Sequence, residues 1–148
     1  MTIYPDASLL VSLLYGKDQQ HAKAMRWFKA NQSNRWVVSA WAEFETVNSL
    51  RSLCLRPGGP SPEVAESLRR WFKHLFTHGP FYRERVEWNQ VLVDAHQISA
   101  SLAARQKARS ADTLHVAILE QINPDLFVSM DADQASLAVR RGFKATCV

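Results

Sequence analysis

The sequence predicts an α/β fold in which helices cover both faces of a parallel sheet. Two short apolar segments, 2–5 and 126–130, are each followed directly by an aspartate, and a third, 36–39, ends at a serine. Stretches with the apolar spacing of helices separate these segments. Strands that alternate with helices are typical of parallel sheets, because parallel neighbours need a long crossover connection.

The first half of the chain predicts three helices around one internal strand. Gly16-Lys17-Asp18 ends the first helix, and Asp18 is suited to cap the second. Pro57-Gly58-Gly59-Pro60 is the strongest helix breaker in the chain. The expected elements after the first strand are helices over 7–15 and 18–30, a strand over 36–39 and a helix over 40–55.

The second half of the chain predicts four helices and three strands. Pro62 lies near the start of a helix and Gly79-Pro80 beyond its end, which is the usual asymmetry of the two residues. The expected elements are a helix over 62–76, a short edge strand within 80–87, helices over 89–107 and 111–122, the strand at 126–130, a helix over 132–141 and a strand over 143–146.

Length and composition predict one domain over residues 1–148. A chain of 148 residues buries about 68–70% of its unfolded surface. Its 47% apolar and 22% charged residues are ordinary globular usage. Cys54 and Cys147 lie far apart without metal-binding spacing, which suits a reducing compartment. We find no signal-peptide pattern and no run near the roughly 18 apolar residues of a membrane span. A cytoplasmic protein is expected.

The charge of the chain favours a polyanionic partner. The net charge is +4, and pooling several acids at one site would leave the remaining surface more positive. Most basic clusters are read as solvated helix faces. The exception is Arg105, Lys107 and Arg109, which lie just before Asp112. We expect these three side chains to hold phosphates.

Four acidic residues far apart in the sequence are expected to meet at one edge of the sheet. Asp6 and Asp131 follow strands, and Asp112 lies in the first turn of a helix opened by Ser110. The fourth acid comes from the helix over 40–55. Ligands bind at the carboxyl ends of parallel strands. Carboxylate oxygens suit Mg²⁺ and Mn²⁺, and such ions support phosphodiester hydrolysis. A metal-dependent nuclease is the resulting hypothesis.

Each acid also has a plainer interpretation. Asp6 and Asp131 suit the N-cap of the following helix, and Asp112 suits the positive end of the helix dipole. Glu43 and Glu45 point to nearly opposite faces of their helix, and periodicity does not decide between them. His115, three residues after Asp112, is read as a hydrogen-bonded histidine, and Asp133, two residues after Asp131, as a first-turn acid. The chain has no P-loop, GxGxxG or GxSxG motif, which excludes the common nucleotide-driven and acyl-transfer chemistries.

Four motifs in order give the chain a resemblance to PIN-domain ribonucleases, most closely to VapC-like toxins. Tyr4-Pro5-Asp6-Ala7-Ser8 resembles the family's first-strand motif. Residues 39–51, SAWAEFETVNSLR, are similar to a segment with a glutamate six residues after a strand-end Ser or Thr and then ExxNxLR, which favours Glu45 over Glu43. Residues 112–117 match DxLHxA, and residues 127–142 resemble FxTxDxxQxxLAxxxG, with Ser129-Met130 in place of the commoner Thr-Phe.

The resemblance implies a three-layer α/β/α domain with metal-dependent endoribonuclease activity. The implied ligands of one or two Mg²⁺ or Mn²⁺ ions are Asp6, Glu45, Asp112 and Asp131. Supporting roles fall to Ser8, Asn48, His115, Ser129 and, less directly, Asp133. The resemblance also implies a homodimer and an antitoxin whose C-terminal segment occupies the active-site groove.

Three other functions stay open at this stage. A housekeeping PIN nuclease of tRNA or rRNA processing has the same acids, and a non-catalytic RNA-binding domain retains the same fold. A dehalogenase-like phosphatase also begins with a strand-end aspartate, but that family needs a second aspartate where this chain has Ser8. Clustered carboxylates argue for a cation, since two of them 4 Å apart repel by about 4 kcal/mol at an effective dielectric of 20.

Overall fold

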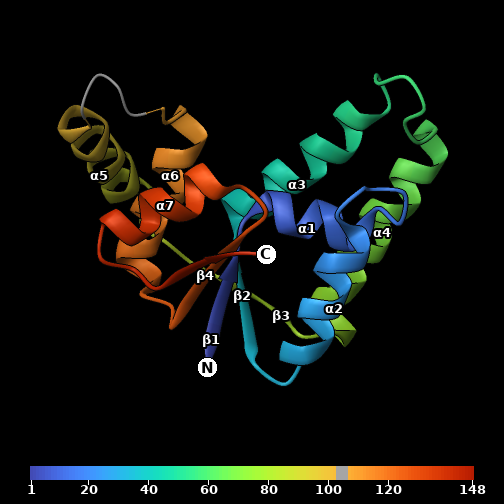
Figure 1. Cartoon of the computed structure of the whole chain (residues 1–148), viewed down its shortest axis with the longest axis horizontal. Helices are drawn as coiled ribbons and strands as arrows, with labels where there is room; N and C mark the ends of the chain where they lie inside the picture. Colours follow the sequence, from blue (N-terminus) through green and yellow to red (C-terminus); the bar gives the residue numbers. More distant parts are fainter. Residues whose placement is uncertain (103–106) are drawn as a thin grey trace.

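The computed structural model describes residues 1–102 and 107–148 and shows a five-stranded parallel sheet with helices on both faces (Figure 1). The strands are β1 (Thr2–Pro5), β2 (Arg35–Ser39), β3 (Phe81–Glu84), β4 (Leu126–Ser129) and β5 (Ala145–Cys147). Their order is β3-β2-β1-β4-β5, and each neighbouring pair is parallel. The predicted α/β class with a central parallel sheet is confirmed.

The helices divide between the two faces of the sheet. They are α1 (Ala7–Leu14), α2 (His21–Asn31), α3 (Ala40–Leu53), α4 (Pro62–His78), α5 (Trp88–Ser101), α6 (Ser110–Ile122) and α7 (Ala132–Arg140). Figure 1 shows α1 to α4 on one side of the sheet and α5 to α7 on the other. Among the described residues, no helix is both long enough and apolar enough to cross a membrane.

The core lies on both faces of the central strands. Ile3, Trp36 and Phe127 are completely buried, as expected for strands covered by helices on both sides. Trp36 packs edge-on against Phe28 of α2, with ring centroids 4.9 Å apart. Continuous apolar strands were the sequence signal for this arrangement, and burial on both faces is its physical cause.

Two helix boundaries differ from those predicted by three or more residues, and the others agree within two. The helix expected over 89–107 ends at Ser101, and Leu102 has the extended angles φ −72° and ψ 133°. The second helix begins at His21 instead of near Asp18. The Asp18 carboxylate accepts hydrogen bonds from Ser12 Oγ and the Gln20 N–H, which hold the preceding turn.

The last strand begins two residues later than predicted because of the way α7 ends. Gly142 has φ +91°, a left-handed conformation that glycine adopts easily. The Phe143 N–H donates to the Ala138 carbonyl and the Gly142 N–H to that of Val139. These two bonds form a Schellman motif, so Phe143 belongs to the helix end.

The topology creates a switch point beside β1. The chain adds β2 on one side of β1 and β4 on the other. Asp6 directly follows β1, and its N–H donates to the Val128 carbonyl of β4 at 2.9 Å. Ligands of open α/β sheets bind at such a point, beyond the carboxyl ends of the strands.

A carboxylate-lined cavity as the candidate active site

One cavity at the carboxyl edge of the sheet is lined by all four predicted acids. Its volume is about 370 Å³, and its walls come from α1, α3, α6 and the segment after β4. Asp6, Glu45, Asp112 and Asp131 all contribute to it. Residues separated by more than a hundred positions in the sequence therefore meet at the switch point.

Asp6 is the most buried of these acids. It is 1% exposed, and its Oδ1 accepts the Leu9 N–H at 2.9 Å, which caps α1. Burial raises the pKa of Asp6 above its ordinary value of 3.8, while His115, Ser129, Leu9 and Ser8 act in the opposite direction. The desolvated carboxylate gains from any cation that enters the cavity.

Two serines join Asp6 to the end of β4. Ser8 Oγ lies 2.7 and 2.8 Å from the two Asp6 oxygens and accepts the Met130 N–H. Ser129 Oγ donates to Asp6 Oδ2 at 2.6 Å and accepts the Asp131 N–H at 2.8 Å. The backbone that carries Asp131 is thus tied to the carboxylate of Asp6.

Glu45 is held by a buried chain of hydrogen bonds. His115 Nε2 lies 2.7 Å from Glu45 Oε2, and His115 Nδ1 lies 3.1 Å from the Tyr4 hydroxyl. That hydroxyl lies 2.7 Å from Ser39 Oγ, which caps α3 by accepting the Ala42 N–H. A carboxylate only accepts, so His115 donates from Nε2. In neutral His115, Nδ1 then accepts from Tyr4, which stays protonated because burial raises its pKa well above the usual range.

The two glutamates of α3 take different directions. Glu45 lines the cavity, whereas the Glu43 carboxylate pairs with Arg83 of β3 at 2.9 Å. Both side chains are about a quarter exposed, at 26% and 23%. Burial therefore does not distinguish the two glutamates, whereas the hydrogen-bond partner of each carboxylate does.

Asp112 and Asp131 also cap the helices on which they lie. Asp112 Oδ2 accepts the Arg109 N–H at 2.7 Å. Asp131 Oδ1 accepts the N–H groups of Asp133 and Gln134. Asp131 is thus the N-cap that its plainer interpretation predicted and Asp112 the predicted first-turn acid, while both also line the cavity.

The oxygen-only donor set of the cavity suits a hard cation such as Mg²⁺ or Mn²⁺. Within residues 1–102 and 107–148, however, no three His, Cys, Asp or Glu side chains lie close enough together to hold a metal ion. Each carboxylate is instead bonded to hydroxyl, imidazole or backbone N–H groups around it. For these carboxylates to share one cation, their side chains have to rotate away from these hydrogen-bond partners.

The other predicted site residues are more scattered. Arg109 lines the cavity, Lys107 is exposed away from it, and Arg105 lies outside the described residues. Asn48 is exposed on α3 and accepts hydrogen bonds from Arg51. Asp133 is exposed and does not line the cavity.

Sequence reasoning missed several lining residues. Ser49 and Ser52 line the cavity beside Glu45, and their helical spacing from it was the available signal. Gln134 stands three positions after Asp131, on the same side of α7. Arg56 comes from the segment after α3 and faces the cavity from a loop. No periodic pattern places a loop residue.

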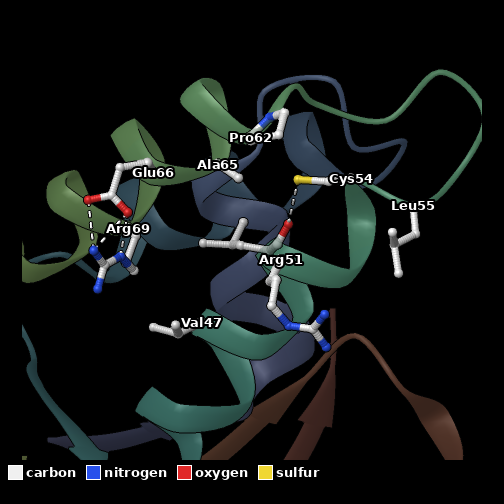
Figure 2. Close-up of a pocket in the computed structure, with 9 residues that line it drawn as sticks. Val47, Arg51, Cys54, Leu55, Pro62, Ala65, Glu66 and Arg69 are labelled. Carbon is white, nitrogen blue, oxygen red and sulfur yellow. Dashed lines mark hydrogen bonds and ion pairs between the residues drawn. The ribbon is translucent and has the colours of Figure 1, made fainter.

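A second cavity lies between α3 and α4 and has a different character. Its volume is about 380 Å³, and Val47, Leu50, Cys54, Leu55 and Ala65 contribute to its wall. Figure 2 labels its two lining arginines, Arg51 and Arg69, and marks the hydrogen bonds between Arg69 and Glu66. The predicted acids do not line this cavity.

Comparisons with known proteins agree with the fold. A family model described as PIN domain matches residues 3–140. No curated protein sequence matches the chain. The solved structure of Mycobacterium tuberculosis VapC20, described as a sarcin-ricin loop cleaving toxin, superposes with a TM-score of 0.69 at 16% identity, over 90% of this chain and 93% of that one. FitAcB from Neisseria gonorrhoeae gives a TM-score of 0.66 at 14% identity, over 97% and 95%.

Proposed function

The chain belongs to the PIN domain family, and from this premise we propose that it is a Mg²⁺- or Mn²⁺-dependent endoribonuclease and the toxin of a toxin–antitoxin pair. One observation carries the proposal. Asp6, Glu45, Asp112 and Asp131 line a single cavity at the switch point of the sheet. A buried, desolvated carboxylate in a cavity lined by three others is costly without a counter-charge and suits a cation.

The four acids are the proposed ligands of the divalent ion. When bound, such an ion activates a water molecule and stabilises charge on the scissile phosphate. The protein's contribution is to hold the carboxylates. Ser8 and Ser129 fix the two oxygens of Asp6, and His115 fixes Glu45 through Nε2. Hydrogen-bonding partners of this kind orient the ligating carboxylates.

The cavity also carries positive charge for an RNA backbone. Arg109 contributes directly, and Arg56 faces the same cavity from the α3–α4 connection. We assign phosphate contacts to Arg109 together with Lys107 and Arg105. Asn48 and Asp133 keep only supporting roles, since neither lines the cavity.

The proposed partners follow from the same assignment. A toxin of this kind acts in the cytoplasm, pairs with an antitoxin whose C-terminal segment enters the active-site groove, and forms a homodimer of single-domain subunits spanning residues 1–148. VapC20 is described as cleaving the sarcin-ricin loop. A ribosomal RNA loop is therefore a reasonable first substrate to test on this chain.

The test is cleavage of total cellular RNA by the purified protein, with the ends mapped by sequencing. We expect cuts in Mg²⁺ or Mn²⁺ and none in EDTA. Cuts confined to precursor ends of tRNA or rRNA would favour a housekeeping nuclease over a toxin. Full cleavage in EDTA, or none with either ion, would overturn the proposal.

A further inference from the structure

Three aromatic side chains form a stack on the exposed face of α4. Trp71, His74 and His78 are all exposed, and their spacing of three and four positions places them on one face of the helix. The Trp71 and His74 rings have centroids 5.2 Å apart and an interplanar angle of 21°. For His74 and His78 the values are 4.3 Å and 16°. The two imidazoles are therefore nearly parallel and one helical turn apart.

The stack covers the faces of the His74 ring and leaves its edge open. A nucleobase binds an aromatic side chain through a free ring face, whereas His74 is stacked with both Trp71 and His78. The lone pair of a neutral imidazole lies in the plane of the ring and projects from its edge. The pair is thus suited to bind through in-plane nitrogen donors, which is how histidine ligates metal ions.

A pair of hydrogen bonds determines which nitrogen of His78 carries the lone pair. Thr77 Oγ donates to the His74 carbonyl at 3.0 Å and lies 2.8 Å from His78 Nδ1. A hydroxyl has one hydrogen, so Thr77 Oγ accepts from the Nδ1–H of His78. In the neutral ring, Nε2 is then the free donor atom. Metal-binding histidines are held in this way, with the second ring N–H donated to a neighbouring oxygen.

We propose that His74 and His78 form a binding site for a transition-metal ion of the Zn²⁺, Ni²⁺ and Cu²⁺ class, with Nε2 of His78 and one ring nitrogen of His74 as ligands. Helical zinc sites use two histidines at this spacing of four positions. Metal–nitrogen bonds of about 2.0–2.1 Å hold two ligand nitrogens within about 4 Å of each other. Ring centroids 4.3 Å apart meet this requirement after a small tilt of the rings.

The end of α4 also favours a cation. His78 is the last residue of the helix, where the carbonyl groups carry a negative partial charge. Imidazole nitrogen suits Zn²⁺, Ni²⁺ and Cu²⁺, whereas carboxylate oxygen suits Mg²⁺ and Mn²⁺. Among the described residues, no third His, Cys, Asp or Glu joins the pair, so water completes the coordination of the ion.

This site is separate from the carboxylate cavity in position as well as in chemistry. α4 ends at His78, three residues before the amino end of β3 at Phe81. The carboxylate cavity lies at the carboxyl edge of the same sheet. The two histidines are therefore at the opposite edge, and the inference does not depend on the proposed nuclease function.

The test is Ni²⁺ binding to the untagged protein, measured by isothermal titration calorimetry in excess Mg²⁺. The Mg²⁺ occupies oxygen-ligand sites and competes poorly for imidazole. We expect one Ni²⁺ per chain. Thr77→Val removes the hydroxyl that holds His78 and should weaken binding about tenfold. His74→Gln and His78→Gln should each weaken it by more than that. His96→Gln is the control, because His96 is exposed on α5 without a second histidine on that helix.

The variants also show where the ion binds. Their melting temperatures without Ni²⁺ should match wild type, because the substituted side chains are exposed. Equal Ni²⁺ affinity in wild type, His74→Gln and His78→Gln would show an adventitious ion only and would overturn the inference, as would no Ni²⁺ binding by wild type. Glu45→Gln should keep full Ni²⁺ affinity. Its loss there would place the ion beside His115, which is bonded to Glu45, and would contradict the site on α4.

Discussion

The two cavities have nearly the same volume, and α3 forms a wall of both. The carboxylate cavity measures about 370 Å³ and takes Glu45, Ser49 and Ser52 from this helix. The cavity between α3 and α4 measures about 380 Å³ and takes Val47 and Leu50 from it. One helix thus separates two spaces of similar size and opposite chemistry.

The two cavities differ in the state of their polar groups and not in their size, and this difference makes the carboxylate cavity the candidate active site. On the apolar side, the Arg69 guanidinium is already paired with Glu66. On the carboxylate side, four acids line one cavity, and Asp6 is only 1% exposed. Burial of the Asp6 carboxylate disfavours its charged form when no cation is bound. We expect substitutions on the carboxylate side to affect RNA cleavage and substitutions on the apolar side to affect stability.

The largest expected effect is on cleavage by Glu45→Gln. The substitution removes a proposed ligand charge and should lower kcat by about a thousandfold, equivalent to about 4 kcal/mol of transition-state stabilisation. Steady-state cleavage of an RNA oligonucleotide in Mn²⁺ measures it. Glu43→Gln is the matched control on the same helix, and its kcat should be close to that of wild type. A larger loss of kcat in Glu43→Gln than in Glu45→Gln would mean that the face of α3 that carries Glu43, and not the face that carries Glu45, takes part in cleavage.

A loss of stability without loss of chemistry is expected from Leu50→Ala. Leu50 is 1% exposed and lines the apolar cavity, so its truncation should cost about 2–5 kcal/mol of unfolding free energy. Urea denaturation measures this cost, with Leu55→Ala as the control because Leu55 is 80% exposed on the same cavity. Cleavage by folded Leu50→Ala should be unchanged. A loss of kcat as large as that of Glu45→Gln would end the distinction between the two cavities.

A smaller, pH-dependent effect is expected from Asp6→Asn in EDTA. Burial raises the pKa of Asp6, so the folded protein favours the protonated acid. Stability from this group is fully present below its unfolded pKa of about 4 and is lost as pH rises through the raised folded pKa. The asparagine variant does not titrate there. Its melting temperature relative to wild type should therefore increase from pH 4 to pH 7, and a constant difference would contradict the desolvation of Asp6.

The smallest expected effect concerns the salt dependence of RNA binding. Lys107→Gln and Arg109→Gln should each lower the slope of log K against log salt by about 0.7 for each lost phosphate contact. Arg69→Gln at the apolar cavity should leave the slope unchanged. Equal effects at both cavities would mean that RNA is held by overall charge instead of by the carboxylate side.

The sequence predicted the elements that depend on periodicity and strand ends. Asp6 and Asp131 were placed correctly at the sheet edge, because a strand-end residue needs only the strand to be recognised. Ser129 follows the same logic, and its hydroxyl bonds to Asp6 as expected of a neighbour at that edge. The strand order, with β1 beside β4, brings these separately predicted residues to the same edge of the sheet.

The rest depends on contacts that a linear pattern does not carry. Arg56 faces the cavity from a loop, and Asn48, which the resemblance gave a supporting role, is bonded to Arg51 and does not line the cavity. The end of α5 at Ser101 is not marked by a breaker such as that at Pro57–Pro60. Gln134 lines the cavity from α7, and this placement depends on how α7 packs in the folded chain.

The central claim is that four carboxylates, each bonded locally as a helix cap or to a histidine or serine, share a divalent ion in one cavity. The most direct measurement is the rise in melting temperature on adding Mn²⁺ after EDTA. Wild type should gain about 2.7 kcal/mol at a hundredfold excess over Kd. The amide variants of Asp6, Glu45, Asp112 and Asp131 should each lose most of that gain, and Glu43→Gln should keep it. A full gain in all four variants would contradict the claim.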